Sequence, residues 1–206
     1  MNLIELLIIF IIYLFSSLHS GYLVTKYMFS KNIYDIGFES SGFSNVYRQF
    51  GLKFGIFVGL YDCLIKGFLP IYLLDLYSAS DLLISFSSLS IILGHLFSPY
   101  HRFKGGRGIL SCIGIGFALG WFLEIMIVIV IFKFFEVFLW RNNALSTFLG
   151  ITTFMFVIPI AFENNIFIIC FELIFLLLLF KRIITNNINM NVNLDIILKR
   201  ILYDTN

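Results

Sequence analysis

The sequence predicts an all-α integral membrane protein that crosses the bilayer about seven times. Hydrophobic residues make up 60% of the 206-residue chain and charged residues only 13%. One soluble core of this size cannot bury so much apolar surface. Apolar runs recur from one end of the chain to the other, with only three prolines and no polar linker between them. We therefore expect a single membrane-embedded domain over residues 1–206.

The apolar runs give the expected helices in order. A helix needs about 20 residues to cross the hydrocarbon layer, and somewhat fewer where the bilayer is thinned. The first run begins beside the acidic Glu5 and has no small-residue cleavage pattern, so we expect a retained span and not a removed signal peptide. The runs fall near 3–25, 54–77, 82–100, 109–122, 124–139, 144–160 and 166–180.

The positions of the basic residues decide how the stretch 109–139 is divided. A split at Gly120, Trp121 and Glu124 gives seven spans, and every Lys and Arg except Lys66 then lies on one side of the membrane. Without the split there are six spans, and the basic residues after residue 180 fall on the opposite side. Because Lys and Arg are enriched in cytosolic loops, the pattern favours seven spans, an extracytoplasmic N-terminus and a cytosolic C-terminus.

The end of the chain and its overall charge restrict the partners. Apolar residues recur at helical spacing over 193–203, which predicts a short amphipathic helix on the cytosolic membrane surface, with an unstructured tail as the alternative. A net charge of +2 without a basic, aromatic-rich helix excludes a nucleic-acid partner. The three cysteines lie in apolar runs without CxxC spacing, so we expect no metal site and no cofactor.

Lys66 is the basic residue that lies inside a predicted span. A charge at the bilayer centre costs about 2.5 to 3.5 kcal/mol on insertion scales. Asp62 lies four residues earlier on the same helix face and can pair with it. Two interpretations stay open: a structural ion pair inside the bundle, or a Lys66 that faces a polar cavity and helps to hold an anion.

Two loops on the basic side have residues suited to phosphate. Residues 103–108 (FKGGRG) place three glycines and two cations directly before a helix, where backbone N–H groups and positive charge can converge. Residues 37–48 combine small hydroxyl side chains with Asn45 and Arg48, whose guanidinium can hold a phosphate through two parallel hydrogen bonds. Each loop alone could be an ordinary solvated turn, but together they favour a phosphorylated ligand.

With these loops the sequence resembles PlsY, the bacterial family of membrane glycerol-3-phosphate acyltransferases that use acyl-phosphate as donor. The segments GHLF at 94–97 and FKGGRG at 103–108 resemble the family's GHxFP and FKGGKG motifs, with Ser98 in place of the proline. Residues 37–48 are similar to the family's GSGNxGATNVxR. The order and spacing of the motifs agree over roughly residues 10–150.

Elsewhere in the chain, the likeness to the family is looser. The family's GSxPxG element matches at Ser17 and Gly21, with His19 in place of its proline. Asp62 and Lys66 resemble a DxxKG element lengthened by one residue, and Arg141 to Thr147 are similar to a stretch that precedes a late span.

The resemblance implies a reaction, a location and a set of partners. Glycerol 3-phosphate would attack acyl-phosphate to give lysophosphatidate and inorganic phosphate, at a cytosol-facing site in the bacterial inner membrane. We expect a monomer surrounded by membrane lipids. Carried over by position, the catalytic candidates are Arg48, Lys104, Arg107, Ser41 and Asn187. The substrate-binding candidates are Ser40, Gly42, Ser44, Asn45, Lys66, His95, Gly105, Gly106 and Gly108.

The sequence also departs from the family at two polar positions. Phe38 stands where the family has an active-site serine, and Ile184 stands where it has a histidine. Three hypotheses follow: an active and divergent acyltransferase, a member of the family that binds a lipid or partner without catalysis, or an unrelated carrier or scaffold in which Asp62 and Lys66 mark a permeation path.

Overall fold

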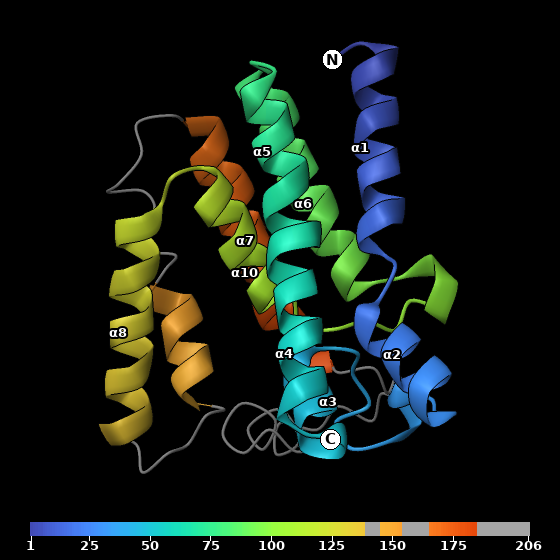
Figure 1. Cartoon of the computed structure of the whole chain (residues 1–206). Coiled ribbons are helices and arrows are strands. Elements are labelled where there is room, and N and C mark those ends of the chain that lie inside the picture. The colour runs from blue at the N-terminus through green and yellow to red at the C-terminus, as the bar shows by residue number, and fades with distance from the viewer. Residues whose placement is uncertain (139–144, 154–164, 185–206) are drawn as a thin grey trace. The chain divides into compact units, whose positions relative to one another are not determined.

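The computed structural model describes residues 1–138, 145–153 and 165–184, and the regular elements in these residues are all helices (Figure 1). Within them, Leu3–Phe29, Leu52–Leu76 and Asp81–His101 are long and apolar enough to cross a membrane. These findings confirm the all-α class. The number of spans and the sidedness of the termini stay predictions. The helices form two compact units, residues 1–120 and residues 121–206, and the single-domain organisation stays a prediction as well.

The first apolar run forms two helices, where the sequence suggested one. α1 (Leu3–Ser16) begins with a capping box between Asn2 and Glu5, and α2 (Ser20–Phe29) begins after His19, whose backbone is extended. At the break the Ser17 hydroxyl donates to the Tyr13 carbonyl at 2.7 Å, in addition to the bond from the Ser17 backbone N–H at 3.1 Å. The break turns His19 and Ser20 into the interior of the first unit, where both are buried.

The second run is one continuous helical rod with a widened middle. α4 (Leu52–Leu60) leads into the π-helix η2 (Tyr61–Phe68), which continues as α5 (Leu69–Leu76). A π-helix has a wider turn than an α-helix and is often found at functional sites. η2 carries both Asp62 and Lys66, and both side chains are buried.

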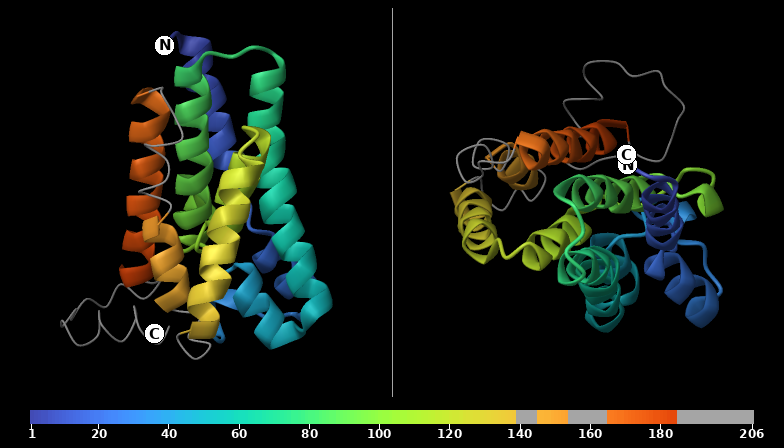
Figure 2. Two further views of the ribbon diagram at one scale, coloured as in Figure 1. Left: turned by 90° about the vertical axis from the view of Figure 1, so that its left-hand side faces the viewer. Right: turned by 90° about the horizontal axis from the view of Figure 1, so that it is seen from above.

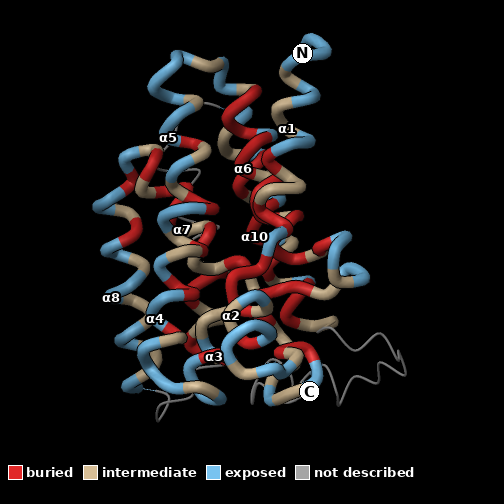
Figure 3. The backbone as a smooth tube through the Cα atoms, turned by 45° about the vertical axis from the view of Figure 1, so that its right-hand side comes forward, coloured by how far each residue is buried: buried red, intermediate tan, exposed pale blue. Residues whose placement is uncertain are grey.

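α6 (Asp81–Leu96) is the most buried helix of the first unit, and Figure 3 shows it mainly in red and tan beside a largely exposed α1. Hydroxyl groups join the two elements to each other. The Ser90 hydroxyl donates to the Ile9 carbonyl at 3.0 Å, and the Tyr13 hydroxyl donates to the Phe97 carbonyl at 2.9 Å. Such polar contacts are typical of helix pairs in membranes, where apolar contact alone does not favour association.

α7 (Ile109–Ala118) packs closely against η2 because glycines lie on both sides of the contact. A methyl group on Gly114 would lie 2.0 Å from the Cys63 carbonyl oxygen, and one on Gly67 would lie 2.3 Å from the Ser111 carbonyl oxygen. Small residues permit this approach of two backbones. It brings the start of α7, where the FKGGRG loop ends, next to Asp62 and Lys66.

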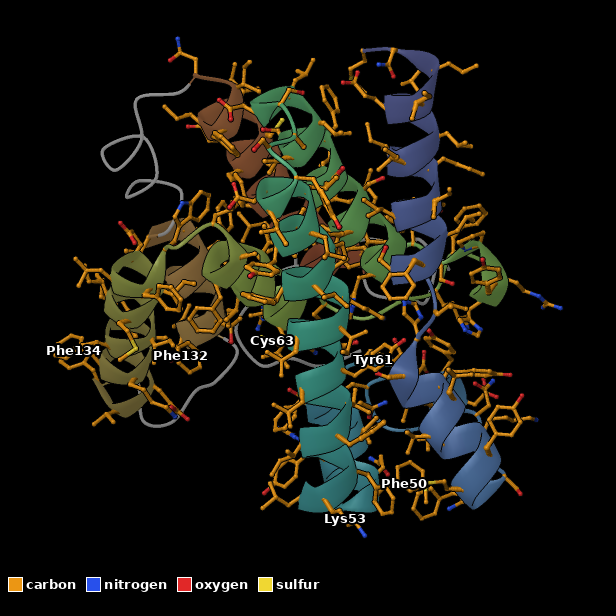
Figure 4. The ribbon with its side chains drawn as sticks, turned by 45° about the horizontal axis from the view of Figure 1, so that its top comes forward. Phe50, Lys53, Tyr61, Cys63, Phe132 and Phe134 are labelled. Atoms are coloured by element: carbon orange, nitrogen blue, oxygen red, sulfur yellow. The ribbon has the colours of Figure 1, made fainter. Side chains whose placement is uncertain are left out.

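The loop before α3 (Phe43–Phe50) packs on a small apolar core. The short helices η1 (Ile33–Asp35) and η3 (Pro99–His101) belong to the connecting segments. Within the first unit, the N-terminus and the α5–α6 connection lie at one end, and α3 and the start of α4 lie at the other (Figures 1 and 2). Lys53 and Phe50 mark this second end in Figure 4. The core residues are Ile33, Tyr34, Val46 and Val58.

The second unit begins at the division predicted from charge. α7 ends at Ala118, Gly120 has a φ of +78°, and α8 (Phe122–Phe138) follows, so the helix break between 118 and 122 is confirmed. Residues 145–153 and α10 (Asn165–Ile184) are also helical. Phe132 faces the 145–153 helix at Gly150, whereas Phe134 points away from it (Figure 4). The predicted 193–203 helix and Asn187 lie outside the described residues.

Candidate active site

The first of the two segments predicted to suit a phosphate is residues 36–42. We call it the Arg48 loop, because it leads into α3, the helix that carries Arg48. Asn45, fully buried in α3, organises it with its side-chain amide. The amide nitrogen donates to the carbonyls of Ile36 at 3.0 Å and Ser40 at 2.9 Å, and to Ile33 at 3.3 Å. The amide oxygen accepts from the Phe38 N–H at 2.9 Å. In this conformation Asn45 shapes the loop, and a direct contact with substrate stays a prediction.

The second segment is the glycine loop, residues 103–108, which follows α6 and η3. Its backbone folds back on the end of α6, where the Gly106 N–H donates to the His95 carbonyl at 3.0 Å. A methyl group on Gly106 would lie 2.2 Å from His95 Nε2. The sequence suggested that the glycine N–H groups face a phosphate, but the Gly106 N–H is occupied here. The absence of a side chain at Gly106 is instead explained by the close approach of the His95 ring, which leaves no room for a methyl group.

The two loops meet at the ring of Phe38. The guanidinium carbon of Arg48 lies 4.6 Å from the ring centroid, and that of Arg107 lies 5.5 Å from it. Both distances are within the range of cation–π attraction. Arg48 is exposed on α3, and Arg107 is half-buried. Two cations that are 59 residues apart in sequence therefore share one aromatic neighbour, at the position where the resemblance placed a serine.

A buried polar cluster lies where η2, α6, α7 and α2 approach one another. Asp62 is its centre: Lys66 Nζ lies 3.3 Å from its carboxylate, and His95 Nδ1 lies 3.9 Å from the same oxygen. The Ser20 hydroxyl donates to this carboxylate at 3.4 Å. The ion pair predicted from the spacing of Asp62 and Lys66 is thus confirmed. Pairing offsets part of the cost of placing both charges in a dry interior.

His95 connects this cluster to the glycine loop. Its Nδ1 also lies 3.3 Å from the Ser111 hydroxyl at the start of α7, and its Nε2 side faces Gly106. The ring is 3% exposed. His95 therefore supports the glycine loop from beneath and links that loop to the carboxylate of Asp62.

His19 joins η1, which directly precedes the Arg48 loop, to the same region, a contact that the sequence did not reveal. Its Nε2 lies 3.1 Å from the His95 carbonyl oxygen, and its Nδ1 is hydrogen-bonded to the Tyr34 hydroxyl. Because a carbonyl only accepts, Nε2 carries the hydrogen and Nδ1 accepts from the Tyr34 O–H. The only signal in the sequence was a histidine in place of a proline in the likeness to GSxPxG.

Aromatic rings lie next to His19. His101 of η3 stacks on His19 with centroids 5.5 Å apart, and Tyr22 lies 4.2 Å from His101. Burial raises the pKa of the Tyr34 phenol, which therefore stays protonated and can act as the donor to His19.

The remaining predicted residues have different settings. Ser41 is buried, and its hydroxyl makes no well-formed hydrogen bond within the described residues. Ser40 is half-buried and Ser44 is exposed. Lys104 is half-buried, with its backbone N–H bonded to the His101 carbonyl. Two predicted glycines end at helix caps: Gly42 precedes α3, and Gly108, with a φ of +76°, precedes α7.

Comparison with known proteins gives the family. The family described as Glycerol-3-phosphate acyltransferase matches residues 6–191. A glycerol-3-phosphate acyltransferase of Legionella pneumophila (strain Corby) is 30% identical over 159 residues, which are 75% of this chain and 55% of that relative. The enzyme of that name from Geotalea daltonii is 27% identical over 177 residues, 86% of this chain and 89% of the relative. The chain thus matches about half the length of the Legionella relative.

Solved structures share the fold. A crystal structure of PlsY, an integral membrane glycerol 3-phosphate acyltransferase, in its glycerol 3-phosphate form has a TM-score of 0.77 at 23% identity, over 86% of this chain and 88% of that one. The lysophosphatidic acid form has a TM-score of 0.74 and covers 90% of both chains. The family match includes the Arg48 loop, η2 and the glycine loop, and the fold agrees with it, so the chain belongs to the glycerol-3-phosphate acyltransferase family.

Proposed function

We propose that this chain transfers an acyl group from acyl-phosphate to the 1-hydroxyl of glycerol 3-phosphate, in the synthesis of membrane phospholipids. The observation that carries the proposal is the convergence of Arg48 and Arg107 on Phe38, within a chain whose family match extends over residues 6–191. Both substrates carry phosphate, and two cations held close together suit a site that must neutralise and align such groups.

The reaction is an exchange at one acyl carbon. The 1-hydroxyl oxygen of glycerol 3-phosphate forms a bond to this carbon, and the bond from the carbon to the phosphate oxygen breaks. The products are lysophosphatidate and inorganic phosphate, and the departing phosphate takes up the hydroxyl proton. No cofactor is required, since acyl-phosphate already carries a good leaving group.

Residue roles follow from position. Arg48, Lys104 and Arg107 supply the charge that binds the two phosphates, and Ser41 supplies a buried hydroxyl at the edge of the Arg48 loop. Ser40 and Ser44 add hydroxyl donors. Gly42 is the N-cap of α3, which carries Arg48, and Gly108 is the N-cap of α7, which follows Arg107. Lys66 and His95 set the charge beneath the glycine loop through Asp62. Asn187 completes the proposed catalytic set.

The assay uses purified full-length protein with acyl-phosphate and labelled glycerol 3-phosphate. We expect labelled lysophosphatidate and an equal amount of inorganic phosphate. A folded preparation that gives no lysophosphatidate above background would contradict the proposal.

A second candidate function is ligand binding without catalysis. It is favoured by Phe38 and Ile184, which replace a serine and a histidine of the family pattern. In that case the protein binds glycerol 3-phosphate or lysophosphatidate but forms no product. Equilibrium binding measured beside the assay separates the two functions.

We further propose seven spans in the bacterial inner membrane, with an extracytoplasmic N-terminus, a cytosolic C-terminus and a cytosol-facing site in a monomer. The positive charge near α2, α3 and the start of α4 supports this orientation. Single cysteines at the exposed positions Ser78 and Ser44, in a cysteine-free background, test it. An impermeant maleimide should label position 78, and not position 44, in intact cells. The reverse pattern would overturn the orientation, and light scattering in detergent tests the monomer.

A further inference from the structure

The ring of Phe38 lies close to two of the three cations that the proposed function uses. It is half-buried, with the guanidinium carbon of Arg48 at 4.6 Å from its ring centroid and that of Arg107 at 5.5 Å. Two positive groups near each other repel, and an aromatic ring attracts both through the negative face of its π-system. The ring therefore offsets part of the repulsion that opposes their approach.

The backbone holds the ring in this place. The Phe38 N–H is bonded to the buried Asn45 amide at 2.9 Å. The residues on both sides have positive φ angles, +59° at Gly37 and +50° at Glu39, so the chain reverses sharply at Phe38. For Glu39 this conformation is uncommon and costs energy that the surrounding contacts must offset. The position of the ring is thus set by the fold of the Arg48 loop.

A ring holds a cation differently from a carboxylate. A carboxylate occupies the N–H groups of an arginine with hydrogen bonds and cancels its charge. A cation–π contact uses the face of the ring and leaves the charge and the five N–H donors for another partner. The contacts with Phe38 therefore do not themselves occupy the N–H donors of Arg48 and Arg107, which are the groups that bind phosphate oxygens.

We infer that Phe38 is a positioning residue that pre-aligns Arg48 and Arg107 for a shared phosphate group. This inference rests on the proposed function for the identity of the substrate. The alignment of the cations concerns any phosphate, including inorganic phosphate.

Substitution of the ring tests the inference. Phe38→Leu keeps an apolar side chain and loses both cation–π contacts, each worth about 0.5 to 1 kcal/mol. We expect kcat/KM for glycerol 3-phosphate to fall about 5- to 30-fold, mainly through a higher KM. Phe38→Tyr and Phe38→Trp keep an aromatic face, and we expect them to retain activity within about twofold. Phe38→Met serves as the second non-aromatic variant if the leucine variant does not fold.

Phe43→Leu is the matched control. Phe43 follows the Arg48 loop directly. Its ring stacks on Tyr47 with centroids 5.8 Å apart and packs against Gly59, so its aromatic contact in the described structure is with a neutral ring. We expect its kcat/KM to stay within about twofold of the unsubstituted protein. An equal loss in Phe43→Leu and Phe38→Leu, or in Phe38→Tyr and Phe38→Leu, would overturn the positioning role.

Binding of inorganic phosphate to the full chain in detergent, measured by calorimetry, gives a readout that does not depend on turnover. We expect Phe38→Leu to weaken phosphate binding by a factor similar to its effect on KM, and Phe38→Tyr to preserve it. Equal affinity in all variants, or no phosphate binding by the unsubstituted protein, overturns the inference. Phosphate binding that depends on an aromatic residue at position 38, without any acyl transfer, supports it and rejects the proposed function alone.

Discussion

The Arg48 loop and the glycine loop meet at the ring of Phe38, which contacts Arg48 of α3 and Arg107 of the glycine loop, yet opposite features of their sequences give the two loops their shapes. At the Arg48 loop one polar side chain from the adjoining α3, Asn45, accepts one backbone hydrogen bond and donates to three carbonyls. In the glycine loop it is the lack of a side chain at Gly106 that lets the backbone lie against His95. We therefore expect the Arg48 loop to be destabilised by removal of the Asn45 amide, and the glycine loop by addition of a methyl group at Gly106.

Removal of the cations should have the largest effect and tests whether both loops take part in catalysis. We expect Arg48→Ala and Lys104→Ala each to lower product formation by at least about 100-fold. Each change removes a fixed positive charge that stabilises the negative charge of the reacting groups most strongly in the transition state. The radiolabelled acyl-transfer assay measures this loss, with expression and folding checked for each variant.

Lys53→Ala is the control for these variants, since Lys53 is an exposed lysine at the start of α4. Its rate should be unchanged. Unchanged rates in Arg48→Ala and Lys104→Ala as well would remove both loops from the site, and a loss in only one of them would show that the loops are not equivalent.

Adding a methyl group to the glycine loop should have the next largest effect. In Gly106→Ala the new carbon would lie 2.2 Å from His95 Nε2, so we expect a loss of about 3 kcal/mol in unfolding free energy. Chemical denaturation in detergent measures it. Because truncation of the imidazole relieves the collision, Gly106→Ala combined with His95→Ala should cost less than the sum of the two single changes.

Gly150→Ala provides the comparison for this change, because its new carbon would lie at an ordinary 3.7 Å from Phe132. It should be neutral or slightly stabilising within its helix. Strict additivity of Gly106→Ala and His95→Ala would argue against the steric explanation of the glycine loop.

Removal of the organising amide tests the Arg48 loop. Asn45→Ala leaves the Phe38 N–H and three carbonyls without this partner, and we expect a loss of about 2 kcal/mol in unfolding free energy. Ser44→Ala, at the neighbouring exposed position, should leave the stability unchanged. Similar unfolding curves for both variants would mean that the loop holds its shape without Asn45.

The connection between the loops should give the smallest effect. Tyr34→Phe loses the hydrogen bond to His19, a cost of about 1 kcal/mol near neutral pH. Since burial raises the pKa of the native Tyr34 phenol, the unfolded chain releases this proton first as the pH rises past about 10. The unsubstituted protein should therefore lose stability above that pH more steeply than Tyr34→Phe. Parallel pH profiles would contradict the assignment.

The sequence predicted those features that depend on spacing and composition. The apolar runs located the helices, the charge pattern located the break between residues 118 and 122, and the four-residue spacing of Asp62 and Lys66 predicted their ion pair. All three follow from helix geometry and from the cost of charge in a membrane. The family resemblance, based on several motifs in order, is likewise confirmed.

The sequence could not predict contacts to backbone groups or between distant loops. The partners of Asn45 are carbonyls, which every residue has, so no residue type identifies them in advance. The ring of Phe38 looked like the loss of a hydroxyl, and its contact with two arginines needs the fold that unites the loops. The break before α2 lies within an apolar run, where hydropathy alone predicts a continuous helix, and the serine hydroxyls that bond the Tyr13 carbonyl there have no signature in hydropathy.

The π-helix η2 has a wider turn than an α-helix, and such a turn can accommodate an additional residue within a helix. The likeness to a DxxKG element suggested one additional residue between Asp62 and Lys66, and one extra residue in a regular α-helix would rotate everything after it by about 100°. In the wide turn of η2, Asp62 meets Lys66, and Gly67 lies against the Ser111 carbonyl. A π-turn can therefore absorb one additional residue locally and leave the register of the following helix with its neighbours unchanged.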